Sequence, residues 1–175
     1  MIWLIALLVG VVLGLITGGN IDNFARLKFR WPVVVLVAVV LREVVLLTPV
    51  GRIEGAQYVY VLALAAIVAW TILHFDRLGG IWLVTAGGLA NLTVILANGG
   101  RMPVAAELAG ALLHRGHIGQ YTLLGAGTNL NFLADWISIG PIPEAYSPGD
   151  LLIGVGIAVV VFFGVRPLKV RGVGI

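Results

Sequence analysis

Two aspartates, Asp135 and Asp150, are the residues of this sequence best suited to acid–base chemistry. Both lie in residues 98–150, a polar segment between apolar stretches. Two carboxyl groups that share one proton can activate water, because one accepts a proton while the other donates one. If the fold brings the two together, they form the catalytic pair of a membrane-embedded hydrolase.

Asp150 also has a purely structural interpretation. Ser147, Pro148 and Asp150 fit the N-cap, the first and the third position of a helix, which is a capping-box pattern. The negative charge would then also suit the helix N-terminus. Asp135 has no comparable structural explanation, so it is the more informative of the two acids.

The same polar segment indicates a ligand pocket. Arg101 can present a planar pair of donors to a carboxylate or a lipid phosphate, and the amides around it both donate and accept. We expect the pocket to bind a lipid headgroup, a small amphiphile or a partner protein. Its expected residues are Asn98, Arg101, Asn129, Asn131 and Asp135.

Neither a metal nor a cofactor is indicated. His114 and His117 have poor spacing for metal ligands, and a solvated, pH-responsive loop is the better interpretation. The chain has no cysteine, which excludes disulfides, zinc–thiolate sites, iron–sulfur clusters and thiol catalysis. Its net charge of +3 comes with no nucleic-acid motif, so nucleic acid is not an expected partner.

Arg42, Glu43 and Asn91 are polar residues inside otherwise apolar runs. Charges at membrane depth are costly, so they should face the interior of the helix bundle and find partners there. Three interpretations stay open: an ion pair that locks two helices, a ligand or ion site, or a helix boundary that lies closer to the interface.

The composition indicates an integral membrane protein. Of the 175 residues, 60% are hydrophobic and 11% are charged, and the mean hydropathy is +1.07. A soluble domain would have about 25% charged residues. We therefore expect a single all-α membrane domain. Its predicted transmembrane helices are residues 2–17, 31–50, 57–74, 79–97 and 151–166.

Residues 98–150 form the expected cap outside these helices. It should hold a short helix at 103–114 and a second helix at 121–137, which is re-entrant, surface-lying or a sixth span. The first helix lacks a basic start and a cleavage site, so we interpret it as a retained span rather than a signal peptide. Small residues at Gly10 and Gly14 offer a face for a homodimer.

Basic residues give the orientation. With the N-terminus outside, the cytoplasmic side holds Arg26, Lys28, Arg30, Arg77, Arg166, Lys169 and Arg171. The outer side holds only Arg52, Arg101 and Arg115. The positive-inside rule therefore favours an N-out, C-in protein with the cap outside.

Several motifs together resemble a bacterial family of small polytopic membrane proteins whose function is unknown. They are Gly18-Gly19, the Asn-Gly-Gly-Arg-Met-Pro-Val run at 98–104, the stretch 128–135, and Ser-Pro-Gly-Asp-Leu-Leu-Ile at 147–153. The resemblance covers nearly the whole chain. It implies a membrane location and no particular activity.

A looser resemblance is to lipoprotein signal peptidase, an aspartyl enzyme of the outer membrane surface. It is carried by Asn98-Gly-Gly, by Gly127-Thr-Asn129-Leu-Asn131 through Asp135, and by the motif that contains Asp150. The departures are Ser147 in place of Asn, one residue too many between Asn131 and Asp135, and a different number and orientation of helices.

The leading expectation is thus a non-enzymatic protein that binds a membrane lipid or other amphiphile at the outer face, with Arg42, Glu43 and Asn91 beneath the pocket. The alternative is an aspartyl hydrolase. A transporter ranks third, because five spans without a repeat lack the paired halves of many carriers.

Overall fold

The structure is a computed structural model that describes residues 1–25, 27–114, 120–140 and 144–166. Five long helices occupy the predicted apolar stretches: α1 (Ile2–Ile16), α3 (Pro32–Leu47), α4 (Ala56–Ile72), α5 (Ile81–Ala97) and α7 (Pro148–Val165). The helices were therefore predicted correctly to within a few residues. Two short helices join them, α2 (Ile21–Ala25) and the 3-10 helix η1 (Pro49–Arg52).

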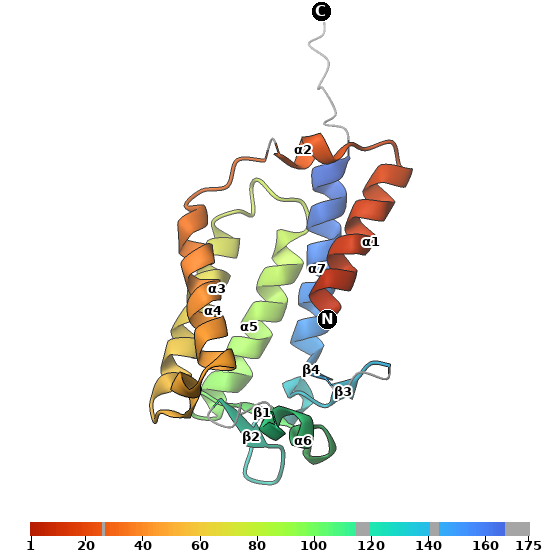
Figure 1. Cartoon of the computed structure of the whole chain (residues 1–175). Coiled ribbons are helices and arrows are strands. Elements are labelled where there is room, and N and C mark those ends of the chain that lie inside the picture. Colours follow the sequence, from red (N-terminus) through yellow and green to blue (C-terminus); the bar gives the residue numbers. More distant parts are fainter. Residues whose placement is uncertain (26, 115–119, 141–143, 167–175) are drawn as a thin grey trace, which may run out of the picture.

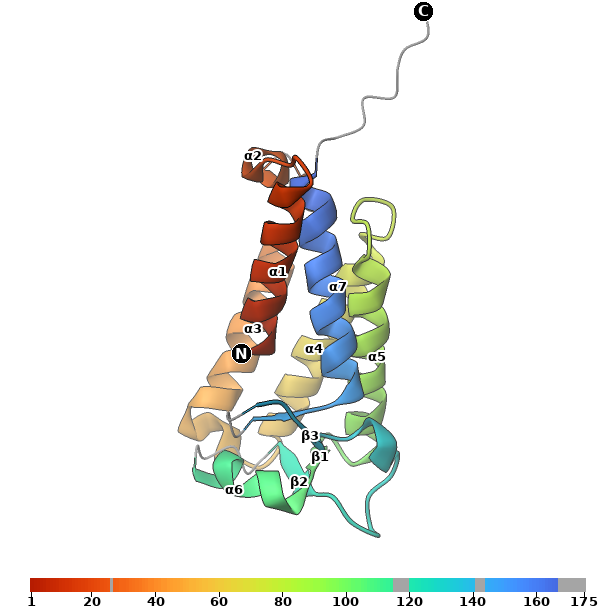
Figure 2. The same cartoon turned by 90° about the vertical axis from the view of Figure 1, so that its right-hand side faces the viewer.

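The long helices do not pack in chain order. In space they lie side by side in the order α1, α7, α5, α4, α3, so α7 packs between α1 and α5 (Figures 1 and 2). Consecutive helices run in opposite directions, which brings α2 and the connection between α4 and α5 to one end of the bundle. Residues 98–114, 120–140 and 144–146 gather at the opposite end, as expected for a cap.

Glycines allow the close approach of α7 to its neighbours. A Cβ atom on Gly10 would lie 2.5 Å from the carbonyl oxygen of Ala158, and one on Gly14 would lie 2.7 Å from the Cβ of Val165. Such distances are too short for real atoms, so only glycine fits there. The face of Gly10 and Gly14, which we expected to serve a homodimer, is thus covered by α7 of the same chain.

The outer faces of the bundle are apolar. Leu4, Ile16, Val33 and Leu36 are each more than 60% exposed, on helices α1 and α3. In the part of the chain that the structure describes, α7 alone is long and apolar enough to cross a membrane by the criteria of length and hydropathy. Helices α1, α4 and α5 are apolar but shorter. The structure therefore supports a mostly helical protein, and five membrane spans remain a proposal.

The cap is built from short strands rather than from two helices. Strand β1 (Met102–Val104) pairs in parallel with β2 (Tyr121–Leu123), and α6 (Ala106–His114) connects them. The 3-10 helix η2 (Asn131–Leu133) leads to β3 (Ile137–Ser138), which pairs antiparallel with β4 (Ala145–Tyr146). Beneath β1 lies an apolar cluster that contains Val61, Leu64, Val94, Ile95 and Met102.

The predicted helix at 121–137 is wrong, whereas α6 confirms the one at 103–114. Leu130 adopts a left-handed backbone conformation (φ 56°), which an α-helix cannot contain. Thr128 and Asn131 also bond to each other and to Gly125 through their side chains. Such local hydrogen bonds compete with helix formation. Arg115 and His117 lie outside the described residues.

Candidate functional site

The backbone around Asp135 is held by β1. Its N–H donates to the carbonyl of Pro103, and its carbonyl accepts from the N–H of Ala105, both at 2.9 Å. Val104 and Asp135 form an isolated parallel bridge, so residue 135 extends the β1–β2 pair on its free side. The neighbours Val104 and Ala134 are buried, which fixes the direction in which the aspartate side chain leaves the backbone.

The Asp135 side chain is buried, with 5% of its surface exposed. Within the described part of the chain, its Oδ1 atom has no hydrogen-bond partner. Burial, and after it the nearby charge of Asp150, raise the pKa of Asp135 well above its usual value of 3.8. This carboxyl group therefore tends to keep its proton.

Asp150 lies in the first turn of α7 and takes part in the predicted capping box. Ser147 Oγ accepts from the Asp150 N–H at 2.9 Å, and Asp150 Oδ2 accepts from the Ser147 N–H at 3.1 Å. The same carboxylate also reaches α5, because Asn91 Nδ2 donates to Asp150 Oδ1 at 2.8 Å. Both oxygens of the Asp150 carboxyl group therefore accept a hydrogen bond.

Asn91 joins α5 to α7. Besides its bond to Asp150, its Oδ1 accepts a hydrogen bond from Ser147 Oγ at 2.7 Å. The absence of a side chain at Gly149 permits this, because a Cβ there would collide with the Asn91 amide. From the sequence, Asn91 was expected to find a partner inside the helix bundle. In the structure this partner is Asp150, whose carboxylate Asn91 orients.

Asp135 and Asp150 line one cavity of about 290 Å³ between the cap and the ends of the long helices. Its other lining residues are Met1, Trp3, Arg42, Glu43, Leu47, Tyr60, Asn91, Ile95, Met102, Tyr121, Glu144, Ala145 and Tyr146. The N-terminal residue Met1 and the first turn of the last long helix thus meet around a polar space. Among the described residues, no three His, Asp or Glu side chains lie close enough together to hold a metal ion.

Arg42 and Glu43 form an ion pair at 2.6 Å, with Arg42 Nη1 donating to Glu43 Oε1. Both are on α3, so the pair itself locks no two helices together. Arg42 instead reaches α4, where its guanidinium lies 5.8 Å from the centre of the Tyr60 ring. Because α3 ends at Leu47 rather than near residue 50, both charges lie closer to the helix end than expected, at the mouth of the cavity.

The remaining predicted pocket residues do not line this cavity. Asn98 Nδ2 donates to the carbonyl of Asn129, and the Asn129 N–H donates back to Asn98 Oδ1. Asn129 Nδ2 also donates to the carbonyl of Ala97, at the end of α5. Asn131 holds its own loop, and Arg101 is an exposed residue next to β1. These amides fasten the cap to α5, and of the predicted set Asp135 alone is a lining residue.

Three tyrosines and Glu144 belong to the cavity but were not singled out from the sequence. Tyr146 donates to Glu144 Oε2, and Glu144 also pairs with the Met1 amino group at 2.9 Å. Burial and the Glu144 carboxylate raise the pKa of Tyr146 to about 12. Tyr60 is a polar residue inside an apolar helix, which is the one local signal that could have identified it.

Comparison with known proteins identifies a family but no activity. Neither a curated protein nor a solved structure matches the chain, so the likeness to lipoprotein signal peptidase stays a prediction. The model of a family of unknown function, DUF5317, matches residues 26–162. This range contains the motifs at 98–104, 128–135 and 147–153 on which the family resemblance rested, though not Gly18-Gly19. The chain therefore belongs to the family of unknown function DUF5317.

Proposed function

We propose that this is an integral membrane protein that binds the polar head of a small amphiphilic molecule in the cavity beneath its cap. The observation that carries this proposal is the cavity itself, a polar space of about 290 Å³ at the end of an apolar bundle. Ligand sites are typically concave and have a few convergent polar groups.

The membrane placement is supported by the apolar outer faces and by the distribution of charge. The expected orientation is N-out and C-in, with five spans in a bacterial inner membrane. Figure 1 shows that the α4–α5 connection and the C-terminal end of α7 lie at the end of the bundle away from the cap. Arg77 belongs to that connection and contacts Lys28, His74 of the same connection contacts Arg30, and Arg166 directly follows α7. Under the positive-inside rule that end faces the cytoplasm, and the cavity opens towards the outer leaflet.

An apolar groove next to the cavity supports an amphiphile over a fully polar ligand. The groove has a volume of about 380 Å³ and is lined by residues of α1 and α7, among them Ile2, Ile5 and Leu151. Ile2 follows Met1 and Leu151 follows Asp150, and both of these preceding residues line the cavity. A molecule with its head in the cavity can therefore lay a hydrocarbon tail along this groove.

Mass spectrometry of the protein purified in a mild detergent tests the binding. We expect a specific amphiphile to co-purify, and Ala145→Phe, which fills the cavity, to release it. Leu96→Phe adds the same ring at an exposed position of α5 that does not line the cavity, so it should retain the ligand. Equal ligand content in both variants and the parent would contradict the proposal.

Topology is tested separately with a membrane-impermeant maleimide, since the chain has no cysteine of its own. Ser138→Cys in the cap should react in intact cells. Asp22→Cys in α2, at the other end of the bundle, should react only after lysis. The reverse labelling pattern would invert the orientation.

A second candidate, an aspartyl hydrolase, is favoured by one observation: Asp135 and Asp150 line the same cavity. Ionised Asp150 would take a proton from water, whose hydroxyl adds to a substrate carbonyl carbon while Asp135 protonates the carbonyl oxygen. Collapse of the adduct would expel the leaving group with a proton from Asp150, while one hydroxyl of the adduct returns its proton to Asp135 and leaves a carboxylic acid. If this is correct, the bound amphiphile is cleaved, and both Asp135→Asn and Asp150→Asn abolish cleavage while the fold is retained.

A further inference from the structure

The charges that line the cavity do not balance. Its acids are Glu43, Asp135, Glu144 and Asp150, and its cations are Arg42 and the amino group of Met1. Each cation already has an acidic partner, since Arg42 pairs with Glu43 and the Met1 amino group pairs with Glu144. Asp135 and Asp150 are left as two carboxyl groups without an ion-pair partner among the described residues.

The hydrogen bonds leave the same two groups incomplete. Asp150 receives donors from Asn91 and Ser147, but these are neutral. Asp135 Oδ1 is buried and has no donor within the described residues. A buried polar oxygen without a hydrogen-bond partner is destabilising, so native proteins rarely leave one unpaired. The site therefore lacks a donor, and its charge calls for a cationic one.

The aromatic lining suits the same kind of ligand. Tyr60 and Tyr121 line the cavity together with the two aspartates. The face of an aromatic ring attracts a cation within about 6 Å, and Tyr60 already accommodates the Arg42 guanidinium at 5.8 Å. An ammonium group can use both carboxylates as hydrogen-bond acceptors and the rings as walls.

We propose that the head of the bound amphiphile carries a protonated primary amine, which binds between Asp135 and Asp150. This inference rests on the proposed binding function and adds the class of ligand. The ammonium donates to both carboxylates and supplies the positive charge that the cavity lacks. The α1–α7 groove takes the tail.

Binding of such a ligand has a measurable consequence for protons. Because burial and the charge of Asp150 raise the pKa of Asp135, free Asp135 tends to be protonated. An ammonium beside it favours the ionised form, so binding releases a proton. The other titratable and charged groups around the site are the Met1 amino group, Arg42 and Glu43 on α3, Tyr60 on α4, Tyr121 on β2, Glu144, and Tyr146 on β4.

Isothermal titration calorimetry of the full chain in a mild nonionic detergent tests the proposal, with four short probes. Hexylamine, hexanol and hexanoate share one tail and differ in the head, while propylamine keeps the amine and shortens the tail. We expect hexylamine to bind at least tenfold more tightly than hexanol, and hexanoate not to bind. Repeating the hexylamine titration in buffers of different ionisation enthalpy should show the released proton.

Variants then assign the effect to the carboxyl group. Asp135→Asn keeps the shape of the side chain. It should lower the affinity for hexylamine at least tenfold, abolish the proton release and leave the affinity for hexanol unchanged. Leu96→Phe should behave as the parent. If Asp135→Asn binds hexylamine as tightly as the parent, or if hexanol matches hexylamine, the amine is not what the site recognises.

The outcomes distinguish failure of the amine proposal from failure of the proposed amphiphile-binding function. Binding of hexanol that Ala145→Phe removes, without a preference for hexylamine, would retain the amphiphile site and overturn the amine. Failure of all probes, with no co-purifying amphiphile, would overturn both. If a lysolipid with an ethanolamine head binds more tightly than hexylamine, the ligand is identified as a lipid. If propylamine and hexylamine bind equally well, the assignment of the tail to the groove is overturned.

Discussion

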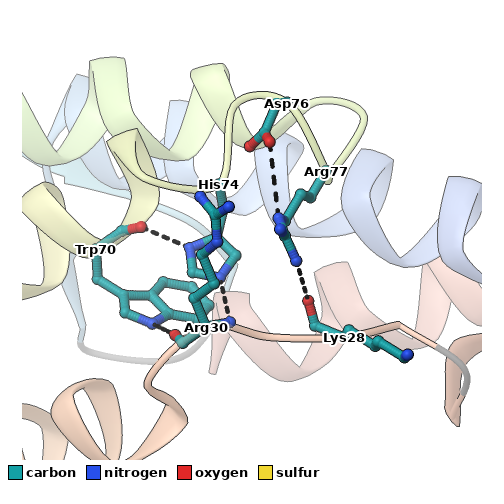
Figure 3. Close-up of polar contacts among 6 residues, drawn as sticks. All are labelled: Lys28, Arg30, Trp70, His74, Asp76 and Arg77. Carbon is teal, nitrogen blue, oxygen red and sulfur yellow. Dashed lines mark hydrogen bonds and ion pairs between the residues drawn. The ribbon is translucent and has the colours of Figure 1, made fainter.

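The two ends of the bundle both bury polar side chains, but they do so differently. At the end away from the cap, His74 is fully buried. Its Nδ1 atom bonds to the carbonyl of Trp70 at 2.8 Å, and its Nε2 atom bonds to the N–H of Arg30 at 2.9 Å (Figure 3). Since the Arg30 N–H is a donor, Nε2 must accept and Nδ1 must donate, which fixes a neutral tautomer.

The same end binds the segment before α3 at further points. Trp70 Nε1 donates to the carbonyl of Arg30 at 2.8 Å. Arg77 Nη1 donates to the carbonyl of Lys28 at 3.4 Å, and Arg77 Nε lies 3.6 Å from Asp76 Oδ2 (Figure 3). Side chains of α4 and of the α4–α5 connection thus bond to backbone groups of Lys28 and Arg30. Both nitrogens of His74 already have partners, so this end has a structural role.

The cap end buries carboxyl groups whose bonding is incomplete. Asp135 Oδ1 has no partner among the described residues, and it belongs to a cavity with surplus acid. The comparison teaches that burial of a polar residue does not by itself indicate function. His74 is more buried than Asp135, yet of these two residues it is Asp135 that retains an unused acceptor.

The largest effect on stability is expected at the end away from the cap, where the buried His74 has both of its hydrogen bonds. His74→Ala removes both ring contacts and leaves the Trp70 carbonyl and the Arg30 N–H without a partner, which should lower the free energy of unfolding by about 2–4 kcal/mol. Unfolding of the purified protein in a titration with sodium dodecyl sulfate measures this. Hexylamine binding by the folded fraction should remain, and its loss would couple the two ends.

Asn91→Ala should affect both stability and binding. It removes the donor from Asp150 Oδ1 and the acceptor from Ser147 Oγ, which should cost about 1–3 kcal/mol and weaken hexylamine. Thr93→Ala is a matched control on the same helix, since Thr93 is exposed and bonds only to its own turn. An equal loss in both variants would show that the α5–α7 bridge has no special role.

Asp135→Asn should change how stability depends on pH. Because the pKa of Asp135 is raised in the folded protein, the folded state binds more protons than the unfolded one above pH 3.8. The contribution of Asp135 to the free energy of unfolding is therefore greatest below that value. It falls as the pH rises towards the raised pKa, by about 1.4 kcal/mol for each unit of the shift. Detergent unfolding at several pH values should show that the variant loses this decline. A decline of the same size in the variant would assign it to another group.

The smallest effect is expected for Arg77→Ala. Its two contacts are long and the side chain is 34% exposed, so the loss should be at most about 0.5 kcal/mol. The same unfolding titration measures it. A loss as large as that of His74→Ala would mean that the charged contacts, rather than the imidazole, hold the segment before α3.

The long helices could be predicted from the sequence because long apolar runs carry a strong local signal. The cap could not, since its structure depends on partners far away in the chain. The leucines and phenylalanine of residues 121–137 resemble a helix, but the bonds between Asn98 and Asn129 impose a loop. Strand β1 pairs with β2 across a gap that contains α6, and nothing local specifies that pairing.

The site was predictable in part for the same reason. Asp135 and Asp150 could be paired from their chemistry and their common place next to the spans, and they do line one cavity. Tyr60, Tyr121 and Glu144 join them only because α7 inserts between α1 and α5. That packing order depends on tertiary contacts that hydropathy does not encode. Asn98 and Asn131 have equally suitable chemistry but are used to hold the cap.

The position of α7 also has a consequence for biogenesis. The main partner of α1 is α7, and the junction is fixed by the N–H of Asn20 donating to the carbonyl of Val165 at 2.9 Å. During synthesis the first helix must therefore wait, without its main neighbour, until the ribosome has made the last. A nascent chain that ends before Pro148 has neither this junction nor Asp150, so the first helix and the cavity reach their native state in one late step.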